Sequence, residues 1–249
     1  MSTKTSIEWT EHTWNPAVGC TKVSAGCAHC YAEVMARRLK AMGTNGYANG
    51  FELTLLPERL DEPLKRRQPT TYFVNSMSDL FHKRIPDSYL DKIFTVIRKS
   101  PQHNFQILTK RSERMADYFN GKTPPKNAWL GVTAENRASG LPRLDDLRTI
   151  RASVRFISVE PLLEDLGDMD LAGIHWVIVG GESGPKARPM KREWVISIKN
   201  KCDEQDVAFF FKQWGGWGVD GKKRAKKLNG RLLDGQTWDA VPGMTFSSI

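Results

Sequence analysis

The feature that most constrains the fold is a repeated alternation of short apolar runs with amphipathic segments. Six runs rich in Val, Ile, Phe and Trp have the length and composition of β-strands: 71–75, 104–109, 128–133, 154–159, 175–180 and 207–212. Several are apolar throughout, as expected for parallel strands that are buried on both faces. Because helical segments lie between them, the sequence predicts a parallel sheet with helical crossovers.

The helices are predicted from apolar residues that recur at intervals of three and four. One helix begins at Asp87 or Ser88 and ends before Pro101, and another begins at Ser112 and ends before Gly121. Three further helices are expected over the ranges 31–42, 141–147 and 194–202.

This alternation predicts an α/β fold, a parallel (β/α) partial or complete TIM-like barrel in a single domain; an open doubly wound sheet is the alternative. We expect residues 1–214 to form a barrel-like catalytic domain, with a cysteine loop at 20–30 and an irregular insert at 43–70. The segment 215–249 is rich in Gly and basic residues, and we expect it to be a basic C-terminal extension.

Composition bounds the class of protein and its partners. The chain is 40% hydrophobic and 26% charged, which is ordinary for a globular protein. No stretch approaches the roughly 20 apolar residues of a membrane span, and the polar start of the chain lacks the apolar core of a signal peptide. We therefore expect a soluble, cytoplasmic protein. Its 37 Lys and Arg against 28 Asp and Glu give a net charge of +9, which favours polyanionic partners or simply solubility.

Three of the four cysteines lie close together. Cys20, Cys27 and Cys30 have the spacing C-x6-C-x2-C, in a loop before the first predicted helix. An odd number of neighbouring cysteines in a long cytoplasmic chain favours a metal site over disulfides. Three thiolates on a four-iron cluster leave one iron open, and that iron is available to a substrate or cofactor.

Zinc is the alternative for this loop. A structural zinc site takes four ligands, typically in two pairs. The sequence has no second C-x2-C pair, although His12, His29 or His82 would be able to supply a fourth ligand. The remaining cysteine, Cys202, lies on the apolar face of a predicted helix, and we expect it in the core.

The segment from Trp14 to Tyr31 contains W-N-P, G-C and C-x2-C-Y elements. In these it resembles the radical S-adenosylmethionine superfamily and, more closely, a phage and bacterial family with a three-cysteine motif. Similar phrases at 158–162 and 212–215 extend the resemblance over most of the chain. The resemblance implies a 4Fe-4S cluster on the three cysteines, S-adenosylmethionine chelated to the fourth iron, a 5′-deoxyadenosyl radical as the hydrogen-abstracting species, and a reductant of the flavodoxin or ferredoxin type.

The sequence departs from the superfamily pattern in three respects. The common spacing there is C-x3-C-x2-C, whereas the first gap here is six residues. An aromatic residue usually precedes the last cysteine, whereas here His29 precedes it and Tyr31 follows it. The glycine-rich phrase ending in Glu usually follows the second strand, whereas Gly180–Glu182 follows a late one.

Polar residues follow the predicted strands, at the strand ends where parallel β/α folds place their active sites. Carboxylates follow three strands, at Glu135, Glu160 and Glu182, and lysines follow two, at Lys110 and Lys212. We predict that they converge on one rim that holds a polar, zwitterionic ligand. Helix caps, turns or ion pairs that only tie the rim together are the alternative.

Roles follow from position and charge. The candidate catalytic residues are Glu160, Lys110, Glu182 and Lys212. The candidate cofactor-binding residues are Tyr31, Ser78, Asp79, Lys110, Glu135, Asn136 and Glu160. Under the resemblance, Ser78 or Asp79 would receive the ammonium group of the methionine moiety, and Lys110 its carboxylate.

The other candidates have less specific roles. Glu135, Asn136 and Glu160 would bind ribose hydroxyls or the substrate. Tyr31 would pack over the cluster or simply anchor its helix.

Basic residues cluster in the sequence, most densely at 222–227, with Trp214, Trp217 and Trp238 nearby. Cations beside aromatic rings suit nucleic-acid strands, so DNA or RNA is the predicted substrate of a modifying or repair enzyme; a mobile, solvated tail is the alternative. Two non-catalytic interpretations also stand: a nucleic-acid-binding module stabilised by zinc or a cluster, and a redox partner.

Overall fold

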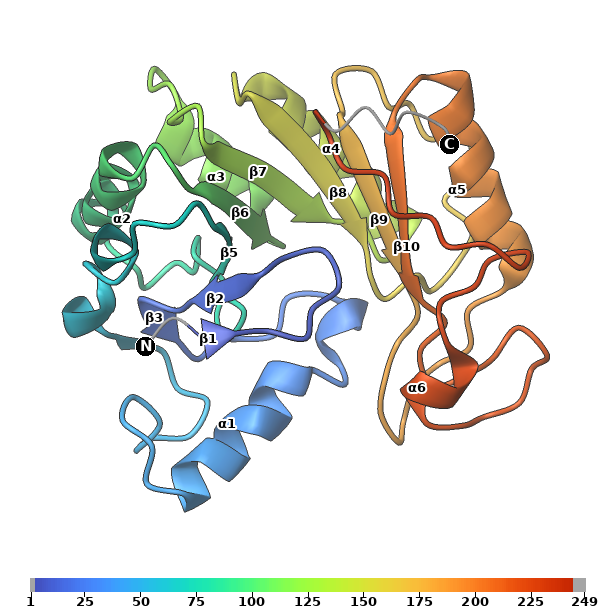
Figure 1. Ribbon diagram of the computed structural model, residues 1–249, viewed down its shortest axis with the longest axis horizontal. Helices are drawn as coiled ribbons and strands as arrows, with labels where there is room; N and C mark the ends of the chain where they lie inside the picture. The colour runs from blue at the N-terminus through green and yellow to red at the C-terminus, as the bar shows by residue number, and fades with distance from the viewer. Residues whose placement is uncertain (1–2, 244–249) are drawn as a thin grey trace. The chain divides into compact units, whose positions relative to one another are not determined.

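A computed structural model describes residues 3–243 of the chain (Figure 1). The predicted α/β class, a parallel (β/α) sheet of the partial TIM-like barrel type, is confirmed. Two compact units make up the chain: a first unit of Met1–Gly131 with Thr149–Ser153, and a second unit of Val132–Arg148 with Val154–Ile249.

The first unit is built on three parallel strands. β2 (His12–Trp14), β5 (Thr71–Val74) and β6 (Asn104–Thr109) pair in that order, and β1 (Thr3–Lys4) lies antiparallel to β2. Trp14, Tyr72 and Phe105 are fully buried. The Tyr72 and Phe105 rings stack with their centroids 5.4 Å apart. Aromatic side chains that pack against one another from neighbouring strands therefore help to hold these strands together.

The helices of the first unit match the predicted apolar faces. α2 (Asp87–Lys99) buries Leu90, Ile93, Phe94 and Ile97, the residues spaced by three and four. α3 (Ser112–Phe119) begins at the predicted Ser112. Within residues 3–243, no helix is both long enough and apolar enough to cross a membrane.

The insert at 43–70 supports the cysteine loop. β3 (Ala17–Val18), just before the loop, pairs antiparallel with β4 (Thr54–Leu55) of the insert, which continues through the short helices η2 (Pro57–Arg59) and η3 (Pro63–Lys65). Gly19 has a φ of +82°, and a Cβ there would lie 2.2 Å from the Glu52 carbonyl oxygen. Only glycine fits where the insert meets the start of the loop.

The second unit also contains three parallel strands. β7 (Ala128–Thr133) leads the chain into it, and β8 (Val154–Val159), β9 (Trp176–Gly180) and β10 (Ala208–Gln213) pair in that order. Its helices are α4 (Arg137–Thr149), α5 (Arg192–Glu204) and α6 (Lys226–Asn229). Figure 1 shows α5 alongside β10. Cys202 of α5 is fully buried, in the core as predicted, and burial raises the pKa of its thiol to about 12.

The glycine-rich phrases after β9 and β10 are in direct backbone contact. A Cβ at Gly181 would lie 2.0 Å from the Trp214 carbonyl oxygen, and one at Gly215, whose φ is +84°, would lie 2.3 Å from the Glu182 carbonyl oxygen. The amide of Gly216 donates to the Glu182 carbonyl at 2.8 Å. The two turns therefore interlock, since neither glycine has room for a side chain.

The described part of the predicted extension packs on the second unit. The amide of Phe211 donates to the Trp238 carbonyl at 2.8 Å, and Asp239 forms an antiparallel bridge with Phe210. The indole of Trp176 donates to the Ala240 carbonyl at 2.8 Å. In Figure 1 this red segment runs back along β10. The predicted domain boundary at residue 214 stays a prediction.

Candidate functional site

The three cysteines lie on one short loop of the first unit. Cys20 follows β3, Cys27 ends the 3-10 helix η1 (Ala25–Cys27), and Cys30 immediately precedes α1 (Tyr31–Ala41). All three are free thiols and partly exposed. Cys30 packs on the apolar cluster that holds α1 against the insert.

The donor chemistry of this loop fits an iron–sulfur cluster, because three thiols that form no disulfide can each bind a different iron. Across residues 3–243, no three His, Cys, Asp or Glu side chains are grouped closely enough to hold a single metal ion.

Arg111, which follows β6, contacts the first cysteine. Its Nη1 donates to the Cys20 Sγ at 3.5 Å and to Asp79 Oδ2 at 2.8 Å. Its Nη2 donates to the Thr21 carbonyl at 2.9 Å and to the Thr21 hydroxyl at 3.1 Å. The guanidinium therefore joins the end of β6 to the cysteine loop. Sequence reasoning selected the adjacent Lys110 and missed Arg111, and no signal in the sequence separates the two.

Asp79 is buried and surrounded by donors from the protein. Its Oδ1 accepts from the Phe81 amide at 3.0 Å and the Thr109 hydroxyl at 2.7 Å. Its Oδ2 accepts from the Lys110 amide at 3.1 Å as well as from Arg111. With four such donors, the carboxylate is set up to hold Arg111 in place rather than to receive an ammonium group.

The charges at this corner shift one another's pKa values. Burial raises the pKa of the Cys20 thiol, Asp79 adds to the rise, and Arg111 opposes it. Burial acts to lower the pKa of Arg111, but Asp79 and Cys20 outweigh it, so that pKa lies above its usual value. The guanidinium thus stays charged beside the sulfur, where it favours the thiolate form that a metal requires.

Ser78 and Tyr31 tie the end of β5 to the cysteine loop. The Ser78 hydroxyl donates to the Gly19 carbonyl at 2.7 Å. The Tyr31 hydroxyl donates to the Ser76 carbonyl. In the first unit the structure therefore brings together the cysteines and the predicted residues Tyr31, Ser78, Asp79 and Lys110.

Asn75, the first residue after β5, is a further candidate that sequence reasoning missed. It is 3% exposed and has a left-handed backbone with a φ of 60°. Neither its Oδ1 nor its Nδ2 has a hydrogen-bond partner. A buried amide without partners costs about 1–3 kcal/mol for each polar group, and backbone strain of this kind clusters at functional sites. Only its place at a strand end marks it in the sequence.

His82 contacts the cysteine loop, and both of its ring nitrogens form hydrogen bonds. Its Nδ1 accepts from the Arg84 amide at 3.2 Å, so Nε2 carries the proton toward the Thr21 hydroxyl, 3.0 Å away. Burial, together with the charge of Arg111, lowers the pKa of His82. This histidine orders the residue next to Cys20, and both of its ring nitrogens form hydrogen bonds within the protein.

In the second unit, the structure brings Glu160 and Lys212 together at the ends of β8 and β10. The Lys212 ammonium lies 2.9 and 2.8 Å from the two carboxylate oxygens. The Gln213 amide donates to the same carboxylate at 3.3 Å. The Glu160 side chain keeps 22% of its surface exposed and Lys212 keeps 13%, so the pair is accessible to a ligand.

The other predicted residues of the second unit are held by the protein itself. Glu135 is fully buried and accepts from Arg143 Nη1 at 2.6 Å. Asn136 accepts from the Ser139 amide at 2.9 Å and thereby caps α4. Glu182 accepts two bonds from the Arg188 guanidinium, at 2.6 and 2.8 Å.

Comparisons with known proteins bear on family and fold. A family model described as "Protein of unknown function (DUF5131)" matches residues 4–242. The search of curated proteins finds no match. A solved structure of spore photoproduct lyase with dinucleoside spore photoproduct is similar at 12% identity and a TM-score of 0.48, covering 82% of this chain and 64% of the lyase.

A mutant of that lyase with bound AdoMet and dinucleoside spore photoproduct is similar at 14% identity and a TM-score of 0.46, over 72% of this chain and 58% of the lyase. The chain thus spans less than two thirds of the length of these lyases. At these identities and TM-scores the likeness carries no argument about activity.

Proposed function

The chain belongs to the DUF5131 family, and within that family we propose that it is a radical S-adenosylmethionine enzyme that acts on nucleic acid. The observation that carries this proposal is the loop of three free, partly exposed cysteines, which meets the polar ends of β5 and β6. The sequence resemblance of the segment from Trp14 to Tyr31 supports the same class.

Cys20, Cys27 and Cys30 would hold the 4Fe-4S cluster. When bound, the cluster and S-adenosylmethionine would supply a 5′-deoxyadenosyl radical that abstracts hydrogen from the substrate. The N–H that Arg111 directs at the Cys20 sulfur would raise the reduction potential, because hydrogen bonds to cluster sulfurs are one of the determinants of that potential. Asp79 fixes the position of Arg111 through its own four hydrogen bonds.

The methionine moiety of the cofactor would bind beside the cysteine loop. Its charged groups require donors and acceptors, and the buried Asn75 amide, directly after β5, offers both without a hydrogen-bond partner in the protein. Ser78 and Lys110 are the further candidates, Lys110 for the carboxylate by charge complementarity. Tyr31 anchors α1 to the end of β5 through its bond to Ser76.

In the second unit, the exposed part of the Glu160–Lys212 pair would contact a ribose hydroxyl or the substrate. Glu135 and Glu182 would act as positioning residues, because each is neutralised by an arginine. A reductant of the flavodoxin or ferredoxin type and a cytoplasmic location complete the proposal, since a reducing compartment keeps the thiols available to a cluster.

Anaerobic reconstitution with iron and sulfide, then dithionite reduction and low-temperature EPR, tests this function. We expect a four-iron signal that changes when S-adenosylmethionine is added, followed by release of 5′-deoxyadenosine. Cys27→Ala should lose the signal. The control Cys202→Ala should keep it, because that thiol is buried in α5 of the second unit.

Stoichiometric zinc without iron uptake would contradict the proposal. That result would favour the non-catalytic nucleic-acid-binding module instead.

A further inference from the structure

Three side chains at the strand ends of the second unit meet at one atom. The Lys212 ammonium and the Gln213 amide both donate to Oε1 of Glu160, at 2.9 and 3.3 Å, and the ammonium also donates to Oε2 at 2.8 Å. Glu160 follows β8, whereas Lys212 and Gln213 end β10. The cluster therefore spans β9, the strand between them.

A bulge in β10 makes this convergence possible. Successive side chains of a regular strand point to opposite faces of the sheet, so Lys212 and Gln213 would diverge. In β10, however, the pairing with β9 skips Lys212, because its neighbours on either side pair with Val179 and Gly180. Bulges of this kind redirect the side chains beside them and are common next to active sites.

Gly180 leaves room for the carboxylate to cross β9. Strands two places apart in a sheet are separated by about 10 Å, so Glu160 and Lys212 meet over β9. A Cβ at Gly180 would lie 3.2 Å from both Cδ and Oε1 of Glu160. The lack of a side chain at this position therefore provides the space that the carboxylate occupies.

The Gln213 amide has a fixed orientation and an unused acceptor. The residue is 3% exposed. Its Nε2 donates to the Gly181 carbonyl at 2.9 Å as well as to Glu160, and lies 3.5 Å from the Ser183 Oγ. A rotated amide would turn Oε1 toward a carbonyl and a carboxylate, neither of which can donate. Oε1 is thus buried without a hydrogen-bond partner among residues 3–243, which costs free energy until a ligand supplies a donor.

The unused oxygen alone does not define a site. Gln106, in the middle of β6, has one too, since its Nε2 donates to the Trp9 carbonyl at 3.1 Å and its Oε1 has no hydrogen-bond partner within the described residues. Gln213 differs because it ends a strand, where parallel β/α folds bind their ligands. The adjoining Glu160 and Lys212 side chains are also partly exposed, so a ligand can approach the cluster.

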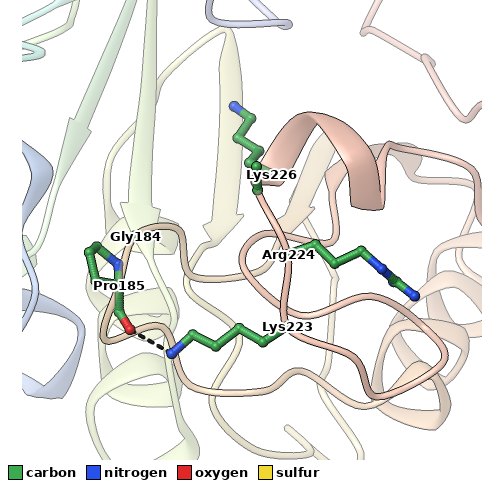
Figure 2. A pocket seen from close by; sticks show the side chains of 6 residues that line it. Gly184, Pro185, Lys223, Arg224 and Lys226 are labelled. Carbon is green, nitrogen blue, oxygen red and sulfur yellow. Dashed lines mark hydrogen bonds between the residues drawn. The ribbon is translucent and has the colours of Figure 1, made fainter.

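The basic hollow of the second unit does not share this convergence. Loops at 184–185 and 223–226 line it. Figure 2 shows the Lys223 and Lys226 side chains extending in different directions, and the Lys223 ammonium donates to the Pro185 carbonyl. The cations of the hollow are therefore dispersed.

The remaining groups of the cluster suit a neutral hydrogen-bond donor. Glu160 and Lys212 neutralise each other, so the pair does not favour a phosphate. Two of the three N–H groups of Lys212 are directed at Glu160, which leaves one. A hydroxyl can donate to Oε1 of Gln213 and accept from that N–H, and an amino group can donate to Oε1. On a nucleic-acid strand these groups are the ribose 2′-hydroxyl and the amino groups of the bases.

We propose that Gln213 is a specificity-determining residue of the substrate site, whose Oε1 accepts a hydrogen bond from a hydroxyl or amino group of the nucleic-acid strand beside the Glu160–Lys212 pair. The inference rests on the proposed nucleic-acid substrate, but it does not require the cluster. S-adenosylmethionine carries similar groups, but its proposed contacts lie in the first unit.

Fluorescence anisotropy of the full chain with three labelled single strands tests this role. The first is an RNA of adenosine, guanosine and uridine, and the second is the DNA with the same bases, which lacks the 2′-hydroxyls. The third is the RNA with purine riboside and inosine in place of adenosine and guanosine, which lacks the amino groups. The wild type should bind one of the two altered strands about tenfold more weakly than the RNA, and that strand identifies the group that Gln213 accepts.

Gln213→Met should bind the three strands within twofold of one another, because it removes the acceptor and keeps a side chain of similar length. The matched control is Gln106→Met, which removes a buried strand amide away from the strand end and should keep the tenfold preference. Gln213→Asn serves as a second variant if Gln213→Met does not fold. It keeps an amide but withdraws the acceptor by one methylene, and it should lose the preference as well.

Weaker binding of all three strands with the preference retained would overturn the proposal and assign Gln213 to the fold. A wild type that binds the three strands equally would overturn it too. So would a variant in which S-adenosylmethionine binding, measured by calorimetric titration, falls while the strand preference stays.

Iron content and EPR separate this proposal from the radical function. A preference lost in Gln213→Met, in a protein whose wild type takes up only zinc, supports the role of Gln213 and rejects the radical function. A preference retained in Gln213→Met, in a protein with the four-iron signal, rejects the role of Gln213 and leaves the radical function in place. A wild type that binds no strand at low salt overturns both the role of Gln213 and the nucleic-acid substrate.

Discussion

Both units pair charges at their strand ends, as Asp79 does with Arg111 in the first unit, but they differ in how far their buried amide side chains are hydrogen-bonded. In the second unit every predicted carboxylate has a cationic partner, in the pairs Glu135–Arg143, Glu160–Lys212 and Glu182–Arg188. In the first unit, the Asn75 amide is buried without a hydrogen-bond partner, and three thiols form no disulfide. An arrangement of neutralised pairs is stable without a ligand, whereas buried groups without partners raise the free energy until a ligand satisfies them.

This difference separates residues that bind a ligand from residues that hold other parts of the protein in position. On this comparison, we propose that the first unit provides the cofactor contacts, and that the pairs Glu135–Arg143 and Glu182–Arg188 of the second unit hold their strand ends in place. Loss of stability should therefore dominate when a buried pair of the second unit is broken. Loss of ligand affinity should dominate when the first unit is changed.

The largest effect is expected for Arg143→Met. This change removes the Arg143 guanidinium that pairs with the fully buried Glu135 carboxylate, and breaking a buried pair in this way costs about 3–5 kcal/mol. Urea unfolding of the wild type and the variant measures the loss. The double variant Glu135→Leu/Arg143→Met should recover most of it, and a single variant as stable as the wild type would remove the positioning role from this pair.

Glu160→Gln should have the next largest effect, on turnover. The change removes the charge opposite Lys212 and the acceptor proposed for a ribose hydroxyl or the substrate. We expect 5′-deoxyadenosine release or cofactor affinity to fall by more than tenfold, equivalent to more than about 1.4 kcal/mol. Wild-type values for both quantities would contradict any role in binding or turnover.

Asn75→Gly should weaken S-adenosylmethionine binding about tenfold, or about 1.4 kcal/mol, without lowering the melting temperature of the free protein. Glycine tolerates the left-handed backbone and removes the two polar groups that lack partners. Calorimetric titration and thermal unfolding give the two readouts. Asp206→Gly is the matched control, because Asp206 is exposed and also left-handed, with a φ of 53°. Lower stability with full affinity in Asn75→Gly would assign Asn75 to the fold.

The smallest effect concerns pH. His175 accepts the Arg155 amide on Nδ1 at 3.0 Å, and burial, then the charge of Arg155, lowers its pKa from 6.5. The unfolded chain therefore binds this proton more readily than the folded protein does. The contribution of neutral His175 to the free energy of unfolding is therefore complete above pH 6.5. It falls as the pH drops from 6.5 toward the lower pKa that His175 has in the folded protein, by at most about 1.4 kcal/mol per pH unit.

Urea unfolding at neutral and mildly acidic pH should show a smaller drop in His175→Gln than in the wild type. An identical drop in the two proteins would assign the acid sensitivity to other groups.

Continuous apolar runs made the larger strands predictable. β6, β7 and β8 begin and end where the sequence predicts, because buried parallel strands need no alternation and end at the first polar residues. The pairing of β3 with β4 was not predictable, since two-residue strands carry no periodicity.

At the candidate site, the convergence of strand ends within each unit followed from the parallel sheet. The hydrogen-bond partner of each individual side chain did not follow from it. Arg111 and Lys110 are adjacent cations in the sequence, and only the direction of the side chain shows which one reaches Cys20. In the sequence Asn75 is an ordinary residue at a strand end. Only the structure shows that its side-chain amide has no hydrogen-bond partner.

The C-terminal segment also covers an edge of the sheet at β10. β10 is the last strand of its sheet, and Trp238 and Asp239 take up part of its outer hydrogen-bonding edge. A bare edge is a template for strands of other molecules. A chain cut after Gly230 would expose that edge together with the Trp176 indole, and it should aggregate at concentrations where the full chain stays dispersed.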